Sequence, residues 1–554
     1  MANSGYNNNA LLILYGFFVL FLSSYVVYGT DSDSITKSLI KSSCTTTLYP
    51  DICYSTLSPV TRNLLTKKDV IELTITKTKE TIQANLHTIN KLMATPNLST
   101  RAKIALNDCL QMVDGTIQQL DTVMQELKAY PNRKSIRHHA NDLKTLMSTT
   151  ITNKETCLDS LSHKDASSKH LRKAIVLGQE YGGKMCSNVL AMIKDMTDKD
   201  IANNNNNNFN ILNFNSKKEA VMWPEWLSAG DRKLLQSGDV TPNKTVAADG
   251  TGDYTSVADA VAAAPSKSTS RYVIKIKAGV YRENVAIPSG KPNLMFIGDG
   301  RGNTIITASE SVAGGNTTFN SATVAAVGSG FLARDITFQN AAGPSGEQAV
   351  ALRVGSDLSA FYRCGIIAYQ DTLYVHSNRQ FFVNCFIAGT VDFIFGNAAV
   401  VLQNCDIQPR LPGPKQKNMV TAQGRTDPNQ NTGIVIQKCK INATSDLLPV
   451  QASYPSYLGR PWKEYSRTVV MQTSISDVIV PAGWYPWDGD FALNTLYYRE
   501  YQNTGPGADT SNRVTWPGWG VITNTTEAES FTAGNFIDGG NWLSSTGFPS
   551  SLGL

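Results

Sequence analysis

The stretch "FYRCGIIAYQDTLYVHSNRQFFVNCFIAGTVDFIFGNAAVVLQNC" (residues 361–405) decides the fold, because one short pattern occurs in it three times. Each copy is a run of apolar and aromatic residues that leads to a cysteine. The cysteines follow one another after 21 and 20 residues: Cys364, Cys385 and Cys405. A repeating unit of this size, with short strands and no helix, predicts a right-handed parallel β-helix in which each turn of chain stacks on the previous one.

Two further segments extend the repeat. "VIQKCKI" (435–441) places Cys439 34 residues after Cys405, which indicates one unit plus an inserted loop. "TFQNAAG" (337–343) has the same shape, with Ala341 in the cysteine position. The repeat therefore covers much of the second half of the chain.

The repeat predicts which side chains are neighbours. Residues one unit apart would lie about 4.8 Å from each other, the separation of adjacent strands. Cys385 is then close enough to Cys405 for a disulfide. It is equally close to Cys364, and only one of these two pairs can form.

Asp392 interrupts the apolar run "FIAGTVDFIF" (386–395), although ionised carboxylates are rarely buried without a partner or a function. Asp371 precedes Asp392 by 21 residues, and Gln370 follows Gln348 by 22. Two carboxyl groups and two amides are therefore expected on consecutive turns of one face.

Other hydrolytic sites fit these residues poorly. The second half has a single histidine, His376, five residues from Asp371, and no G-x-S-x-G sequence, which disfavours a Ser-His-Asp triad. One histidine and four cysteines, three of them spaced for structure, also disfavour a catalytic zinc site. A carboxylate nucleophile with amide donors for an oxyanion remains.

The first half has a different character. A chain of 554 residues is too long for one ordinary core, and apolar residues recur at helical spacing over residues 104–127. An Asn-rich tract from Asn203 indicates a linker, so the boundary lies between about 200 and 238. The net charge of +5 is small and no basic stripe carries aromatic residues, which argues against nucleic-acid binding.

Residues 11–27 form an apolar segment that predicts a signal peptide cleaved after Gly29. The segment lacks a positive n-region and approaches the length of a membrane span, so an uncleaved anchor is the alternative. Either form directs the chain into the secretory route. Five N-x-[ST] sequons are weak support for it: Asn97, Asn243, Asn316, Asn442 and Asn524.

Five motifs in the second half together resemble the plant pectin methylesterase family. They keep the family's order: "GVYRE" (279–283), "GEQAVALR" (346–353), "YQDTLYVHSNRQFF" (369–382), "GTVDFIFGNA" (389–398) and "YLGRPW" (457–462). The first half resembles the pectin methylesterase and invertase inhibitor family, through "CTTTLYPDIC" (44–53). The whole chain is thus similar to a precursor with an inhibitor-like pro-region.

The resemblance implies the domains and the disulfides of the pro-region. The expected order is a signal segment (1–29), a four-helix bundle (30–200), a linker (201–238) and a catalytic β-helix (239–554). The implied bridges are Cys44–Cys53 and Cys109–Cys157, with Cys186 left over and buried. A basic processing site for a subtilisin-like protease is expected in the linker, at Arg232, Lys233, Leu234 and Leu235.

The resemblance also assigns roles. Asp392 would be the nucleophile and Asp371 the general acid and then base. Gln348 and Gln370 would hold the oxyanion, and Arg460 would bind Asp392 and substrate. Trp462 would stack on a sugar ring, and the remaining groove residues would be Thr318, Tyr374, Phe395 and Trp487.

The implied reaction is hydrolysis of methyl esters on galacturonate units of pectin, without metal or organic cofactor. The implied partners are pectin, the processing protease and separate inhibitor proteins, and the mature enzyme would be a monomer in the cell wall. Two rivals are a pectate lyase or polygalacturonase on a similar β-helix, and an inhibitory or structural protein with an inactive enzyme half. Release of methanol without loss of polymer length would separate all three.

Overall fold

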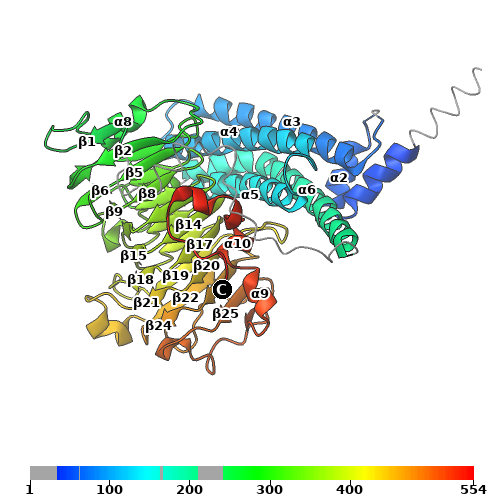
Figure 1. Ribbon diagram of the computed structural model, residues 1–554. Coiled ribbons are helices and arrows are strands. Elements are labelled where there is room, and N and C mark those ends of the chain that lie inside the picture. The colour runs from blue at the N-terminus through cyan, green and yellow to red at the C-terminus, as the bar shows by residue number, and fades with distance from the viewer. Residues whose placement is uncertain (1–33, 61–62, 163–165, 210–240) are drawn as a thin grey trace, which may run out of the picture.

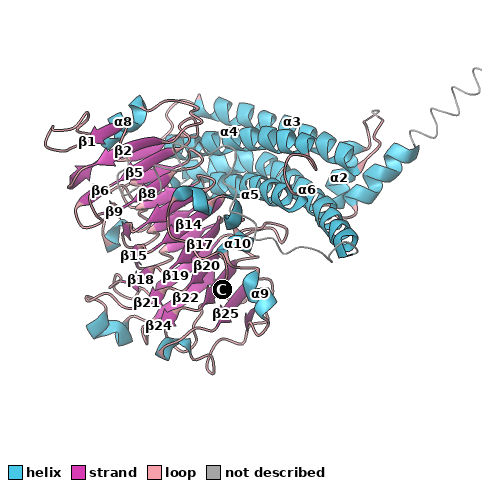
Figure 2. Ribbon diagram, in the orientation of Figure 1, coloured by secondary structure: helices cyan, strands magenta, loops and turns pink. Residues whose placement is uncertain are grey.

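A computed structural model describes residues 34–60, 63–162, 166–209 and 241–554. The expected signal segment (1–29) and the expected processing site (232–235) lie outside these ranges. Within these ranges, no helix has both the length and the apolar character that a membrane span requires. Figure 2 shows a helical half and a half built from strands, as the sequence predicts.

The helical half is a four-helix bundle. Residues 34–44 are helical, and the helices that follow are α2 (Pro50–Leu57), α3 (Lys67–Met93), α4 (Thr100–Ala129), α5 (Ile136–Ser160) and α6 (Ala166–Phe209). Helix α3 packs on α4 and α6, and α5 packs on the same two helices. Thr66, Ser99 and Ser135 cap α3, α4 and α5, because each side chain accepts a hydrogen bond from a backbone N–H of the first turn.

The pro-region disulfides form as the resemblance implied. Cys44 is bonded to Cys53 and Cys109 to Cys157, while Cys186 is a buried free thiol. Helix α6 continues through the start of the Asn-rich tract, which the sequence indicated as linker. Extending an existing helix needs no new nucleus, so weak helix formers can be added to its end.

The second half consists of three parallel sheets in the described part of the chain. The first sheet contains, in spatial order, β1 (Lys244–Val246), β2 (Tyr272–Ile276), β5 (Leu294–Ile297), β8 (Leu332–Arg334), β11 (Ser359–Tyr362), β14 (Arg379–Val383), β17 (Ala399–Gln403), β20 (Gly433–Gln437), β23 (Arg467–Met471), β25 (Tyr497–Tyr501) and β26 (Trp519–Val521). The second contains β4 (Val285–Ile287), β7 (Val324–Ala326), β10 (Leu352–Val354), β13 (Leu373–Val375), β16 (Ile394–Gly396), β19 (Asn418–Gln423) and β22 (Ser456–Pro461). The third contains β3 (Gly279–Arg282), β6 (Thr304–Ala308), β9 (Thr337–Asn340), β12 (Gly365–Ile367), β15 (Phe386–Gly389), β18 (Asp406–Pro409), β21 (Lys440–Ile441) and β24 (Ser474–Ile475).

Short helices lie at the ends and corners of this half: α8 (Val257–Ala263), α9 (Thr525–Glu529), α10 (Ala533–Phe536), η1 (Phe319–Ser321), η2 (Pro344–Gly346), η3 (Leu448–Ser453), η4 (Pro506–Ala508), η5 (Gly539–Asn541) and η6 (Leu543–Thr546). Helix α8 places apolar side chains in the core between the sheets. The C-terminal segment with α9 and α10 packs on the outer face of the first sheet.

The repeated cysteines mark one corner of the β-helix, between the first and third sheets. The residue before each cysteine has a positive φ, which bends the chain from one sheet to the next: Arg363 (51°), Asn384 (53°), Asn404 (54°) and Lys438 (54°). Strand β17 pairs with β20, so the interval of 34 residues is one turn with inserted loops, as predicted.

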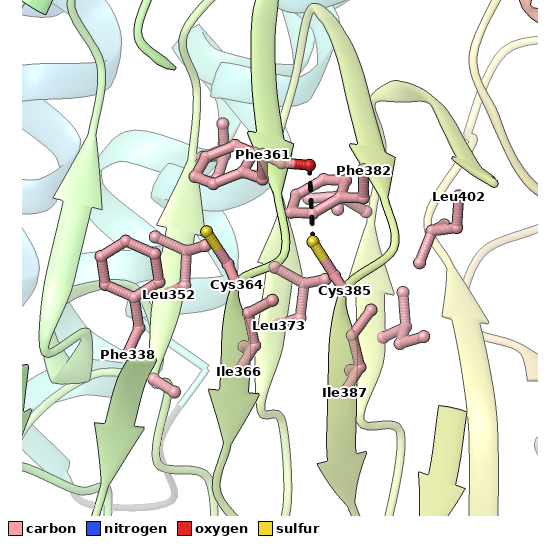
Figure 3. Packing of buried hydrophobic residues seen from close by; sticks show 14 of the residues in the cluster. Phe338, Leu352, Phe361, Cys364, Ile366, Leu373, Phe382, Cys385, Ile387 and Leu402 are labelled. Carbon is pink, nitrogen blue, oxygen red and sulfur yellow. Dashed lines mark hydrogen bonds between the residues drawn. The ribbon is translucent and has the colours of Figure 1, made fainter. Parts of the chain in front are cut away.

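Two details of the repeat differ from the prediction. Cys385 and Cys405 are both free and buried, so the expected disulfide is absent. Stacked side chains point the same way into the core (Figure 3), and the strand spacing of about 4.8 Å exceeds the Cβ–Cβ separation of about 3.8 Å in a disulfide. The register of β9 and β12 also places Ile336, not Ala341, next to Cys364.

The bundle covers the outer face of the second sheet. Figure 1 shows the helices on one side of the stacked strands, and one apolar cluster joins helix residues to outward residues of this sheet. Of the sequon residues, Asn97, Asn243 and Asn524 are exposed, whereas Asn316 and Asn442 are half-buried.

The two disulfides should differ in their contribution to the stability of the helical half. They close separations of 48 residues (Cys109–Cys157) and 9 residues (Cys44–Cys53). Loop closure predicts that paired Cys→Ser replacement costs about 4 kcal/mol at the first bridge and about 2.5 kcal/mol at the second. Denaturant unfolding of each full-length variant, followed by the helical circular dichroism signal, measures this difference; the reverse order of stability would contradict it.

Candidate active site

The site is built on one row of side chains that crosses the second sheet. Strand register aligns equivalent outward positions on successive strands: Ala325, Arg353, Tyr374, Phe395, Ala422 and Arg460. Their neighbours Leu352 and Val354 point into the β-helix core instead. Because side chains alternate along a strand, this row forms one outer face.

Asp371 and Asp392 precede aligned strands and occupy equivalent positions on neighbouring turns. Leu373 pairs with Ile394, and the backbone N–H of Asp371 donates to Val391 O at 3.0 Å. The two aspartates have φ values of 62° and 52°, a region that Asp and Asn adopt more readily than most residues. The spacing of 21 residues therefore brings both carboxyl groups to one place, as predicted.

Arg460 holds Asp392 in a bidentate ion pair. Its Nε donates to Oδ1 at 2.8 Å and its Nη2 donates to Oδ2 at 2.6 Å. The guanidinium also lies over the Trp487 ring, 4.4 Å from the ring centroid. This fork geometry fixes both the orientation and the charge of the carboxylate.

The two carboxyl groups differ in their tendency to hold a proton. Burial and then the negative charge of Asp392 raise the pKa of Asp371 well above its ordinary value. Burial also raises the pKa of Asp392, but its hydrogen bonds and ion pair with Arg460 oppose that rise. A proton shared by the pair therefore resides on Asp371, while Asp392 is the carboxylate.

Gln348 and Gln370 lie beside this pair on neighbouring turns. The backbone N–H of Ala349 donates to Gln370 O at 3.2 Å, and both glutamine side chains line the same cavity as the aspartates. Gln348 Oε1 is buried without a hydrogen-bond partner among the described residues. The oxygen of this amide is therefore an acceptor that the resting protein leaves unused.

Aromatic side chains extend the site along the groove. Tyr374 and Phe395 are stacked with ring centroids 4.2 Å apart, and Phe395 meets Trp462 edge to face at 5.9 Å. A cavity of about 610 Å³ contains Thr318, Trp487 and every other predicted catalytic or groove residue in its lining. The structure thus brings together the complete set that the sequence analysis named.

Helix α5 of the bundle lies over this groove and hydrogen-bonds to successive turns of the β-helix. Thr149 Oγ1 donates to Asn378 Oδ1 (2.7 Å), Asn397 Nδ2 donates to Thr152 Oγ1 (2.9 Å), and Thr156 Oγ1 pairs with His376 Nε2 (2.9 Å). These threonines lie three or four residues apart and so share one helix face. The same helix contributes Thr156, Asp159 and Ser160 to the cavity wall.

Ion pairs flank these hydrogen bonds. Lys463 Nζ lies 3.1 Å from carboxylate oxygens of Glu155 and Asp159 on α5. At the other side, Arg379 Nη1 contacts Asp142 Oδ1 at 2.8 Å. The groove of the second half is therefore closed by polar and charged contacts from the first half.

Sequence reasoning missed several residues of the site. Phe319 lines the cavity and follows the predicted Thr318, but no spacing singled it out. Nothing in the sequence marked Thr156 and Asp159 as site residues, because polar residues at helical spacing usually form the solvent-exposed face of a helix.

Comparisons with known proteins agree with this architecture. The Pectinesterase family model matches residues 243–540, and the Plant invertase/pectin methylesterase inhibitor model matches residues 38–192. "Pectinesterase 3" of Citrus sinensis is 61% identical over 95% of this chain and 90% of that protein. "Pectinesterase" of Daucus carota is 76% identical over 58% of this chain and all of that protein.

A solved structure, "Pectin methylesterase from Carrot", is 75% identical to this chain and superposes with a TM-score of 0.57. It covers 57% of this chain and is itself covered completely, so that solved chain corresponds to the β-helix half alone. With both regions matched, the chain belongs to the pectinesterase family of carboxylic ester hydrolases and carries an inhibitor-type region in front of its enzyme domain.

Proposed function

We propose that residues 241–554 hydrolyse methyl esters on galacturonate units of pectin, releasing methanol and free carboxylates. The observation that carries this proposal is the Asp371–Asp392 pair, in which Arg460 favours the ionised form of Asp392 and burial favours the protonated form of Asp371. A nucleophile and a proton donor are thereby placed side by side.

The reaction proceeds in two steps. Asp392 attacks the ester carbonyl carbon, and the amide groups of Gln348 and Gln370 donate hydrogen bonds to the oxyanion. Asp371 gives its proton to the departing methanol, leaving an acyl group on Asp392. Asp371 then takes a proton from the water that hydrolyses this acyl group and restores Asp392.

The groove residues hold the polymer during these steps. Trp462 and Trp487 flank Arg460 and offer apolar ring faces on which sugar rings stack, while Tyr374 and Phe395 form the floor on the other side. Thr318 supplies a hydroxyl at the rim of the same cavity.

The helical half acts as an inhibitor of the enzyme half in the same chain. Helix α5 covers the groove that the polymer needs and forms part of its wall, and its contacts reach Lys463 and His376 on both sides of the catalytic pair. Cleavage shortly after Leu235, at the basic site Arg232–Leu235, would separate the halves and open the groove.

Isosteric replacement of either aspartate should abolish most of the activity without disturbing the fold. Asn keeps the shape of Asp and tolerates the positive φ at positions 371 and 392. We expect Asp392→Asn and Asp371→Asn to lower kcat by at least about 10²-fold. Gln370→Ala should cost roughly 10–10³-fold through lost oxyanion stabilisation.

Methanol release by the 241–554 fragment, with chain length of the pectin followed in parallel, measures these effects. Arg282→Gln is a matched control, because Arg282 is exposed on the third sheet. Wild-type methanol release by folded Asp392→Asn would refute the mechanism. Shortening of the polymer instead of methanol release would favour a glycosidase.

Loss of the Arg460 charge should move the acid limb of the pH–activity profile. Arg460 lowers the pKa of Asp392, which must be ionised to attack. In Arg460→Gln, Asp392 stays protonated to higher pH, so activity is lost at a higher pH as the solution is acidified. We expect the midpoint of the acid limb to shift to higher pH by about 1 pH unit or more in Arg460→Gln, and by less in Arg460→Lys. An unshifted acid limb in Arg460→Gln would show that this ion pair does not set the ionisation of the nucleophile.

The full chain should release methanol more slowly than the fragment. A tethered inhibitor acts at an effective concentration on the order of millimolar, so we expect at least about a tenfold difference. Thr152→Arg places a long cation between α5 and Asn397 and should restore activity to the full chain. Thr76→Arg, at an exposed position of α3, is the matched control and should leave inhibition intact. Equal rates for full chain and fragment would exclude inhibition in cis.

A further inference from the structure

Three polar side chains of the enzyme half face α5 along one edge of the groove, and we call them the edge strip: His376, Asn378 and Asn397. They are at most 5% exposed, because three threonine hydroxyl groups of α5 cover them. None of them is charged in the precursor, since burial lowers the pKa of His376 to about 3. The mechanism described above gives these side chains no part in the reaction.

The two asparagines of the edge strip are held in place from within the enzyme half. Asn397 Oδ1 accepts hydrogen bonds from Gln423 Nε2 at 3.0 Å and Thr432 Oγ1 at 2.6 Å, so its Nδ2 points outward to α5. Asn378 Nδ2 donates to Gly355 O at 2.7 Å, which leaves its Oδ1 facing α5. These anchors do not involve the helical half, so the outward atoms keep their orientation when the halves separate.

His376 is fixed mainly by contacts with neighbouring rings. Its imidazole meets Tyr374 and Phe319 edge to face, with ring centroids 5.2 Å and 5.5 Å apart. Its Nδ1 lies 2.9 Å from Ser377 Oγ, and its Nε2 is left to pair with the hydroxyl group of Thr156. The enzyme half thus presents three preset polar atoms on one edge.

The edge strip borders the aromatic floor of the groove on the side away from the catalytic carboxyl groups. His376 and Asn397 lie two residues beyond the paired Tyr374 and Phe395, and the backbone N–H of Asn397 donates to His376 O at 3.2 Å. At about 3.3 Å per residue, at most about 16 Å of extended chain separates Asp371 from His376. Side chains that reach inward from both edges leave a width that one sugar ring fills.

The atoms of the edge strip match hydroxyl groups. Asn397 Nδ2 is a donor, Asn378 Oδ1 is an acceptor, and a hydroxyl group can serve either of them. An ionised carboxylate only accepts, so it has nothing to offer Asn378 Oδ1. In the precursor, the partners of these atoms on α5 are the hydroxyl groups of Thr149, Thr152 and Thr156.

We propose that the edge strip binds ring hydroxyl groups of the galacturonate units that lie on the aromatic floor, and that the threonine hydroxyl groups of α5 occupy these positions in the precursor. This proposal rests on the function proposed above. The edge strip holds the sugar ring from the edge opposite Asp371 and Asp392, and so aligns its ester with the nucleophile. Because it recognises hydroxyl groups, its contribution is independent of the charge of the neighbouring units.

Initial rates on a fully methyl-esterified oligogalacturonate test this inference, with the enzyme half released from the purified full chain by cleavage in the linker. His376→Phe keeps the ring contacts and removes Nε2. Asn397→Asp keeps the acceptor for Gln423 and Thr432 and removes the outward donor. We expect each variant to raise KM about three- to tenfold, the effect of one lost hydrogen bond, and to change kcat by less than about twofold. Asn384→Asp, at a corner between the first and third sheets, is the matched control and should leave both constants unchanged.

The uncleaved chain gives an independent readout. Because the same atoms contact α5, His376→Phe and Asn397→Asp should loosen the cover over the groove. We expect methanol release by the full-length variants at saturating oligomer to exceed that of the wild-type full chain by at least about threefold. Damage to the enzyme half alone would lower this rate instead, and that result would contradict the inference.

Unchanged KM in both variants of the released enzyme half, or a fall in kcat without a rise in KM, would overturn the inference and leave the edge strip as a contact surface for α5 alone. If the variants do not fold, the wild-type enzyme half decides the question. Acetylation of the ring hydroxyl groups of the oligomer should raise its KM at least threefold to tenfold, by about the same loss of hydrogen bonds. Equal KM values for the two oligomers would overturn the inference. Absence of methanol release from the wild-type enzyme half would instead refute the proposed function itself.

Discussion

The parallel register between β13 and β16 is the constraint on which the site depends. It stacks Asp371 and Asp392 on neighbouring turns, at the spacing of adjacent strands. Two carboxylates at that spacing in a buried groove cannot both be ionised without a large electrostatic cost. The β-helix cannot relax the pair, because backbone hydrogen bonds on both sides fix each turn. Protonation of Asp371 removes the repulsion between the two carboxylates, and the ion pair with Arg460 keeps Asp392 as the charged one.

The outer row of side chains on the second sheet both lines the candidate active site and contacts the helix bundle. Tyr374, Phe395 and Ala422 belong to one apolar cluster with residues of the helix bundle, and the adjacent polar groups bond to α5. The bundle therefore contributes to the burial that raises the pKa of Asp371 in the precursor. Separation of the halves would hydrate the catalytic pair and weaken that shift, so the precursor and the free enzyme should differ in the ionisation of the pair.

Much of the fold and the candidate site could be predicted from the sequence, because both follow from the period of the repeat. The 21-residue interval between Asp371 and Asp392 equals one turn, so counting residues placed them together. The same counting failed for Cys385 and Cys405, since stacked neighbours at strand spacing point in parallel and do not turn toward each other. Counting residues also gave a wrong position for Ala341. The segment "TFQNAAG" resembles the other copies in sequence, but it forms β9 and the following loop, and the corner equivalent to Arg363 and Cys364 is at Asp335 and Ile336.

The contact between the halves could not be predicted in this way, because nothing in a single sequence pairs α5 with the groove. In the sequence, Thr149, Thr152 and Thr156 resemble a solvent-exposed helix face. In the separated bundle they would be solvent-exposed, so these polar side chains suit a helix that covers the groove only in the precursor. The hydroxyl, amide and ion-pair contacts would exchange protein partners for water at little net cost if the halves part. The apolar cluster that Tyr374, Phe395 and Ala422 form with the bundle would instead expose apolar surface. The Arg379–Asp142 and Lys463–Asp159 pairs would likewise be resolvated when the halves part. The polar contacts would thus favour separation of the halves, whereas the apolar cluster across the interface stabilises the covered groove.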